Sequence, residues 1–111
     1  MQVERTRARR YAFIASIELT DLQSETQSRK QTSNLSLFGC HVEGGECLPT
    51  GTRVRVRIAH KGKILEAVGQ VANNQSKSGI GIRFIKVEEN DQSVLEEWIS
   101  ELRGKQKLSS H

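Results

Sequence analysis

The residues best suited to binding an anion are the arginines of the amino-terminal segment. Arg5, Arg7, Arg9 and Arg10 lie within ten residues that hold a single acidic residue, Glu4. A guanidinium group can hold two phosphate oxygens through parallel hydrogen bonds, stack on a flat base, and read the O6 and N7 edge of guanine. Alone, the segment is a weak signal, because short basic runs are often solvated tails.

The positive charge of the chain is concentrated in this segment. The whole chain carries a net charge of +4, and residues 1–10 contribute +3 of it, which leaves +1 for the other 101 residues. A charge gathered in one short arm favours a small anionic ligand over a nucleic-acid footprint spread across a surface. Nucleic acid is therefore not the partner we expect.

A second polar motif, Asn-Leu-Ser-Leu-Phe-Gly, occupies residues 34–39. Asn34 and Ser36 are of types whose side chains bond to turn amides and still present polar groups outward. Gly39 lacks the Cβ that would prevent a tight turn or a close backbone approach. We expect a turn over residues 34–39, between two strands.

No group of residues in the sequence indicates catalysis or metal binding. The histidines His41, His60 and His111 are dispersed, and no nucleophile with a general base can be assembled from them. Cys40 and Cys47 are too few for a disulfide framework and lack zinc-ligand spacing, so we expect free thiols. The sequence predicts a binding protein without a cofactor or metal, and not an enzyme.

Short strands are the elements that must position the two motifs. Alternating apolar residues predict strands over residues 11–19, 40–43, 52–59, 64–71 and 79–85. The alternation is clearest at 52–59, where Val54, Val56 and Ile58 face inward and Arg53, Arg55 and Arg57 face outward. Residues 21–30 lack apolar periodicity and are expected to form a solvated connection, with pairing resuming near 29–33. Residues 73–78 are expected to form a polar turn.

Turns and a closing helix complete the predicted domain. Residues 60–63 suit a compact hairpin, and Gly69 suits a bulge or a close approach. Asp91 is placed to cap a helix that has apolar residues at helical spacing and ends near Gly104. We therefore expect an arm over 1–10, one domain over 11–103 and a frayed tail over 104–111.

The order of these motifs resembles the PilZ domain family. An Arg-x-x-x-Arg arm precedes the first strand, and Asn-x-Ser-x-x-Gly follows a strand pair. The turn at 48–51, the Gly-Ile-Arg-Phe run at 81–84 and the closing helix extend the likeness from about Arg5 to Leu102. The resemblance implies a mainly β fold, a small six-stranded antiparallel β-barrel with a C-terminal α-helix. It also implies that the barrel binds cyclic di-GMP on its outer surface beneath the arm.

The resemblance further implies roles for particular residues. Arginines of the arm are expected to contact the guanine edges and the phosphates. Asn34 and Ser36 are expected to hydrogen-bond guanine or the sugar-phosphate backbone, and Gly39 to keep the surface open.

The register of the arginine pair is open at this point. Arg10 directly precedes the first strand, where the final arginine of the family motif often lies, but four residues earlier stands Thr6. We interpret Arg5 and Arg9 as the working pair, with Arg10 as a third contact. In the alternative, Arg10 is the anchor and one guanidinium contact has been lost.

The expected function is that of a receptor whose arm becomes ordered over the nucleotide and is read by a downstream protein partner. One alternative is a PilZ-like barrel that binds a partner without nucleotide. Another, less favoured, is a nucleic-acid-binding barrel that uses Arg53, Arg55 and Arg57. No apolar run approaches the roughly 20 residues that span a bilayer, and the basic start lacks an apolar region after it, so we expect a cytoplasmic protein.

Overall fold

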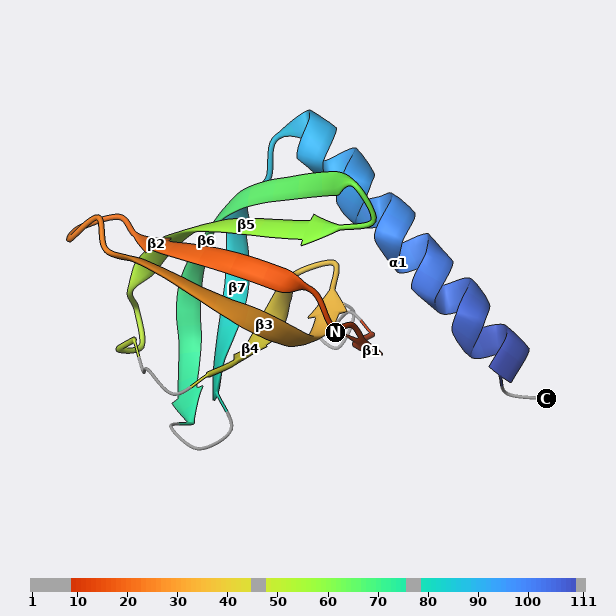
Figure 1. Cartoon of the computed structure of the whole chain (residues 1–111), viewed down its shortest axis with the longest axis horizontal. Helices are drawn as coiled ribbons and strands as arrows, with labels where there is room; N and C mark the ends of the chain where they lie inside the picture. The colour runs from red at the N-terminus through yellow and green to blue at the C-terminus, as the bar shows by residue number, and fades with distance from the viewer. Residues whose placement is uncertain (1–8, 45–47, 76–78, 110–111) are drawn as a thin grey trace, which may run out of the picture.

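The structure is a computed structural model that describes residues 9–44, 48–75 and 79–109. Within these ranges the chain forms seven strands and one helix (Figure 1). Their bounds are β1 (Tyr11–Ala12), β2 (Ser16–Asp21), β3 (Gln27–Ser36), β4 (Gly39–Glu43), β5 (Arg53–His60), β6 (Lys63–Gln75), β7 (Gly79–Lys86) and α1 (Glu89–Ser109).

The strands form a closed antiparallel barrel. Hydrogen-bonded neighbours follow the order β1-β3-β2-β5-β6-β7-β4, and a further pairing of β3 with β4 closes the sheet. Strand β1 pairs only with β3 and lies outside the closed set of six strands. The predicted six-stranded antiparallel barrel with a C-terminal helix is therefore confirmed, with one short additional strand.

The core of the barrel follows the predicted alternation. Val54, Val56 and Ile58 on β5 are fully buried, and the arginines between them are exposed. On the neighbouring strand, Leu19 pairs with Val56 and Ile17 pairs with Ile58, so the two strands fill the interior from directly opposed positions. The arginine strip on β5 is accordingly the outer face of a strand.

Two predicted features that involve glycines are present in the structure: the hairpin over residues 60–63 and the special position of Gly69. Lys61 and Gly62 both have positive φ, 52° and 80°, which is the signature of the two-residue type I′ hairpin between β5 and β6. Gly69 lies at a register shift between β6 and β7, and a Cβ there would come within 2.7 Å of the Ile82 Cγ2 atom. Gly69 is therefore a close-approach position, and the bulge that it faces lies in β7, where Ile85 is the extra residue.

The predicted first strand, 11–19, is broken into β1 and β2. The break is held by Thr32, which is 1% exposed. Its hydroxyl donates to the carbonyl of Phe13 at 2.6 Å and accepts from the amide of Ala15 at 3.0 Å. Phe13 and Ala15 still point into the core, so the apolar alternation survives although the regular backbone pairing does not.

The predicted connection over 21–30 is wrong in its length, because β3 already begins at Gln27. The turn that remains is short, and the Asp21 carboxylate accepts from the amide of Gln23 at 2.9 Å. No side chain of β3 before Thr32 is fully buried, so the backbone bonds to β2 define this half of the strand. The predicted turn over 73–78 is also too long, because β6 continues to Gln75.

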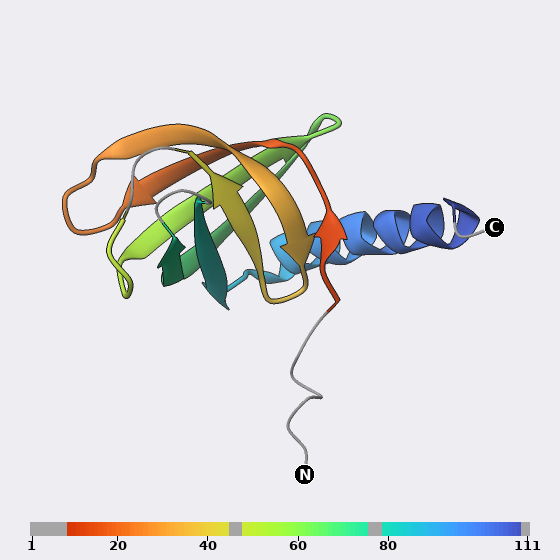
Figure 2. The same ribbon diagram turned by 90° about the horizontal axis from the view of Figure 1, so that it is seen from below.

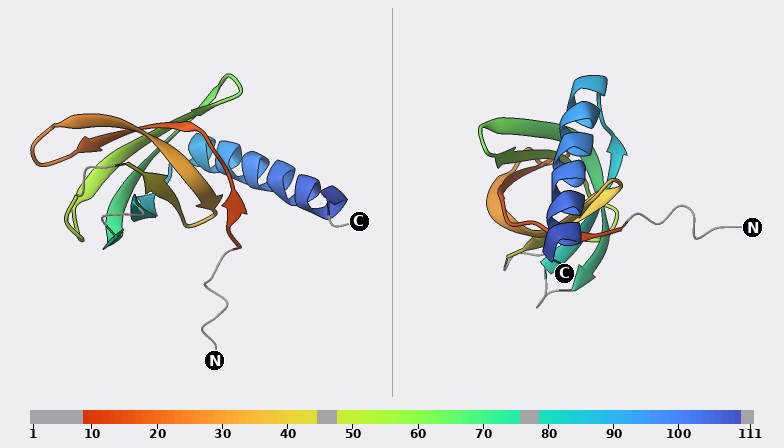
Figure 3. Two further views of the ribbon diagram at one scale, coloured as in Figure 1. Left: turned by 60° about the horizontal axis from the view of Figure 1, so that its bottom comes forward. Right: turned by 90° about the vertical axis from the view of Figure 1, so that its right-hand side faces the viewer.

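Helix α1 lies across one end of the barrel and then extends past it (Figures 1 and 2). Figure 3 shows the same helix in front of the barrel end. Asp91 is not the amino-terminal cap; it lies in the first turn, where its carboxylate accepts from the amide of Glu66 on β6 at 2.9 Å. The predicted end at Gly104 is also wrong, since the helix continues to Ser109. No helix in the described ranges is long and apolar enough to cross a membrane.

An aromatic cluster joins the helix to the barrel. The ring of Phe13 lies 4.6 Å from the ring of His60 and 5.5 Å from that of Trp98, measured between centroids. His60 and Trp98 meet edge to face at 5.4 Å. Burial, together with the nearby charge of Lys61, lowers the pKa of His60. His60 and Trp98 are therefore structural residues of the contact between the helix and the barrel.

The break between β1 and β2 gives a first test. Replacing Thr32 with valine keeps the shape of the side chain but leaves the Phe13 carbonyl and the Ala15 amide without their partner, so the free energy of unfolding should fall by about 1–3 kcal/mol. Urea denaturation measures this loss. Thr20→Val on β2 is the matched control, because Thr20 makes no side-chain hydrogen bond to a described residue; an equal effect in both variants would contradict the role of Thr32.

The aromatic cluster predicts a dependence of stability on pH. Because the folded state lowers the pKa of His60 below its ordinary 6.5, the unfolded chain takes up the proton first as the pH falls. The free energy of unfolding should therefore decline between about pH 7 and pH 5. His60→Gln should flatten that decline in urea titrations across this range, and an unchanged pH dependence would contradict the assignment.

Candidate functional site

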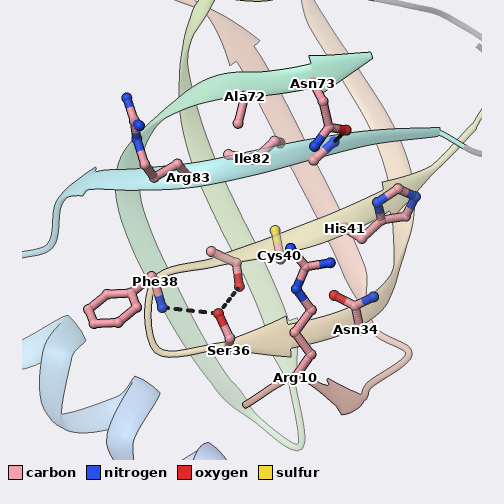
Figure 4. Close-up of a pocket in the computed structure, with 12 residues that line it drawn as sticks. Arg10, Asn34, Ser36, Phe38, Cys40, His41, Ala72, Asn73, Ile82 and Arg83 are labelled. Carbon is pink, nitrogen blue, oxygen red and sulfur yellow. Dashed lines mark hydrogen bonds between the residues drawn. The ribbon is translucent and has the colours of Figure 1, made fainter. Parts of the chain in front are cut away.

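A pocket of about 640 Å³ lies over the seam where β4 joins β3 to β7. Figure 4 shows side chains from β3, β4, β6 and β7, together with Arg10, arranged around it. Arg10, Asn34, Ser36 and Gly39 line this pocket, so the structure brings together four of the residues singled out in the sequence.

The arm reaches the pocket through Arg10. Strand β1 pairs Tyr11 with Leu35 and Ala12 with Asn34, and this register sets Arg10 at the level of Ser36. Figure 4 shows the Arg10 side chain extending over β3 and β4, near Asn34. Arg9 is exposed and does not line the pocket, and Arg5 lies outside the described residues.

Asn34 lies directly after an irregularity in β3. The pairing of β3 with β4 shifts register between Thr32 and Asn34, and Asn34 then pairs with His41. A bulge of this kind re-aims the side chains that follow it. The half-buried Asn34 side chain makes no hydrogen bond to another described residue, which leaves its amide available at the pocket wall.

Ser36 holds the tip of the β3–β4 hairpin. The turn consists of Leu37 and Phe38 only, so the predicted turn over 34–39 is shorter than expected and Asn34 and Ser36 belong to β3. The Ser36 hydroxyl accepts from the Phe38 amide at 3.1 Å and donates to the Gly39 carbonyl at 3.3 Å. Figure 4 shows both bonds, with the Phe38 ring turned away from the pocket.

Gly39 allows β4 and β7 to approach each other at the floor of the pocket. It pairs with Arg83, and a Cβ at Gly39 would overlap the carbonyl oxygen of Ile82 and lie 3.1 Å from the Arg83 Cα atom. The atoms in the way belong to the backbone, which cannot rotate aside as a side chain can. The structure therefore gives Gly39 a role in strand packing, and the expected role in keeping the surface open for a ligand stays a prediction.

The pocket contains further residues beyond those expected from the sequence. Arg83 lines one side and donates to the Gln70 side chain at 2.9 Å. Asn73 and His41 line another side and were not predicted. The sequence signal that could have pointed to Asn73 is the Gly-Ile-Gly run at 79–81. Gly81 in this run donates its backbone amide to the Asn73 side chain at 3.2 Å.

The electrostatic character of the pocket suits an anion. Arg10 and Arg83 are among the residues that line it, and none of the described lining residues is acidic. Burial raises the pKa of the Cys40 thiol to about 12, so this thiol stays protonated and neutral. No cluster of three or more metal-binding side chains occurs in the described part of the chain, and Cys47 lies outside it.

Comparison with known proteins agrees with this architecture. The family model of the PilZ domain matches residues 4–101. No curated protein matches the sequence. Among solved structures, the PilZ domain with c-di-GMP of YcgR from Escherichia coli superimposes with a TM-score of 0.73 at 16% identity, covering 96% of this chain and 97% of that one.

Two longer proteins contain the same fold. YcgR of Escherichia coli in complex with c-di-GMP matches 97% of this chain with a TM-score of 0.74 and 20% identity. The inhibitor of motility MotI/DgrA of Bacillus subtilis matches all of this chain with a TM-score of 0.71 and 16% identity. The present chain spans only 50% and 55% of those two chains, respectively.

The close approach at Gly39 gives a test of the pocket floor. Gly39→Ala should lower the free energy of unfolding by about 1–3 kcal/mol or more, because the new Cβ would meet the backbone of β7. Gly104→Ala is the matched control: nothing lies within 4 Å of a Cβ there, and alanine favours the helix, so stability should rise by up to about 1 kcal/mol. Chemical denaturation of both variants measures the contrast, and a neutral Gly39→Ala would contradict it.

Proposed function

The chain belongs to the PilZ domain family, and we propose that it is a receptor module that binds cyclic di-GMP in the pocket over the β3–β4–β7 seam. The observation that supports this most directly is that Arg10 meets Asn34, whose amide bonds no other described residue, in a pocket whose described lining has no acidic residue. These groups match a ligand that is anionic and carries hydrogen-bonding bases.

The chemistry of the ligand fits the groups that Arg10 and Asn34 bring to the pocket. Cyclic di-GMP carries phosphates, which are acceptors with negative charge, and guanines, whose outer edge presents O6 and N7 as acceptors. A guanidinium group serves either partner through paired donors, and Arg10 supplies one at the mouth of the pocket. The Asn34 amide can both donate and accept, so it is suited to a guanine or to the sugar-phosphate backbone.

Ser36 contributes to the site mainly by holding the turn between β3 and β4. The residue is 7% exposed, and its hydroxyl already bonds the Phe38 amide and the Gly39 carbonyl. Those bonds fix the hairpin tip and therefore the surface that the nucleotide meets. We assign Ser36 and Gly39 to shaping the site, and Arg10 and Asn34 to the direct contacts.

The arm completes the site in this proposal. Arg9 is exposed one residue from Arg10, and Arg5 lies further along the same basic segment. A nucleotide bound on the outer face of a barrel leaves one side open to solvent, and a basic segment can fold over that side through charge-assisted hydrogen bonds. The ordered arm then offers a surface that a downstream protein partner can recognise.

We propose binding without turnover. The pocket thiol, Cys40, is held neutral by burial, and the described lining offers no carboxylate to act as a general base. The ligand is therefore a signal that the protein senses and does not convert.

Calorimetric titration with cyclic di-GMP tests the proposal. The wild-type chain should bind, and Arg10→Ala should weaken binding at least tenfold, as expected for the loss of a charge-assisted contact worth about 1.5–3 kcal/mol. Asn34→Ala should weaken it by a smaller factor. Arg9→Ala should weaken it only if the arm closes over the nucleotide.

The control is Arg29→Ala, which removes an exposed guanidinium on β3 that is paired with Glu18 on β2 and does not line the pocket. This variant should bind like the wild type. No binding by the wild type at ligand concentrations on the order of 50 µM would sink the proposal and favour a barrel that binds its partner without nucleotide. Steeply salt-dependent retention on RNA, sensitive to Arg55→Ala, would instead favour nucleic acid.

A further inference from the structure

A bulge in β6 brings Asn73 to the side of the pocket opposite the arm. The pairing of β6 with β7 shifts register between Val71 and Asn73, which leaves Ala72 as the extra residue. Ala72 and Asn73 both line the pocket, although side chains of successive residues in a regular strand face opposite ways. The irregularity thus adds a polar side chain to a wall that a regular strand would not supply.

Gly81 provides the space that the Asn73 side chain occupies. A Cβ at Gly81 would lie 2.8 Å from the Asn73 Nδ2 atom and 3.0 Å from its Oδ1 atom. Gly81 does not have positive φ, so its backbone conformation is open to any residue. The absence of a Cβ at Gly81 is therefore what leaves room for the Asn73 side chain. Figure 4 shows the Asn73 amide lying over β7 at this point.

The orientation of the Asn73 amide follows from one hydrogen bond. The backbone amide of Gly81 can only donate, and it lies 3.2 Å from the side-chain oxygen of Asn73. The Oδ1 atom is therefore the acceptor for Gly81, and the Nδ2 group makes no hydrogen bond to another described residue. This wall of the pocket consequently presents a hydrogen-bond donor to a ligand.

A fixed donor distinguishes between the two purines. The outer edge of guanine presents two acceptors, O6 and N7, whereas that of adenine presents the acceptor N7 beside the donor N6. We propose that Asn73 is a specificity-determining residue whose Nδ2 group donates to guanine O6, where adenine carries the N6 donor, and so favours cyclic di-GMP over cyclic di-AMP. This inference rests on the proposed function, because it concerns which base the same pocket selects.

Gly81 has a positioning role in this scheme. An alanine at this position would displace the Asn73 amide without removing it, since the atoms that its Cβ meets belong to a side chain that can move. Substitution of either Asn73 or Gly81 should then cause the same loss of preference for guanine, because each removes the same contact from the Asn73 amide. Independent residues would give additive losses instead.

The experiment measures the affinities for cyclic di-GMP and cyclic di-AMP and takes their ratio. Asn73→Ala should lower the affinity for cyclic di-GMP about tenfold and leave that for cyclic di-AMP nearly unchanged, so that the ratio falls about tenfold. Gly81→Ala should lower the ratio similarly, and the double variant should lower it no further. Asn73→Asp keeps the oxygen that accepts from the Gly81 amide and removes the Nδ2 donor, so the preference for cyclic di-GMP should fall in this variant too.

Asn90→Ala on the exposed start of α1 is the matched control and should leave both affinities unchanged. Equal losses for both nucleotides in Asn73→Ala would indicate a phosphate contact and overturn the assignment to guanine. A wild-type preference that survives all the substitutions would overturn the role of Asn73 alone. A wild-type chain that binds neither nucleotide would overturn the proposed function itself, and this inference with it.

Discussion

The close contact of two strand backbones at Gly39 is the constraint on which the rest of the structure depends. Strand β4 must lie between β3 and β7 for the barrel to close, and its first residue meets the β7 backbone where any Cβ would overlap it. The Ser36 hydroxyl holds the turn that delivers Gly39 to that position. The same strand contact therefore closes the barrel and forms the floor of the pocket, because the pocket lies over this seam.

The pocket is polar because the barrel is irregular around it. Asn34 and Asn73 each follow a register shift, one in β3 and one in β6, and both line the pocket. Strand β5, in contrast, alternates regularly and produces only a filled core and a solvated outer face. Bulges cost pairing energy locally, but they turn amide groups toward a surface that regular strands would leave without them.

The sequence predicted the regular parts of the molecule better than the irregular ones. The pattern around Val56 sufficed for β5, because burial and alternation coincide there. The start of β3, before the expected pairing near 29–33, was missed, because backbone pairing forms it and no apolar face marks it. The 34–39 motif led directly to the pocket, yet Asn73 was not foreseen, since a bulge depends on the partner strand. The placement of Arg10 depends likewise on how β1 pairs with β3.

The aromatic cluster has an optical consequence. Trp98 is the single tryptophan of the chain, it is 3% exposed, and its ring contacts Phe13, three residues beyond Arg10. Its fluorescence therefore comes from one known place, the contact between α1 and the start of the barrel. A rearrangement of the arm that disturbs Phe13 would alter the emission of this indole. The chain thus carries its own spectroscopic probe, with no label attached, within contact of the residue that follows β1.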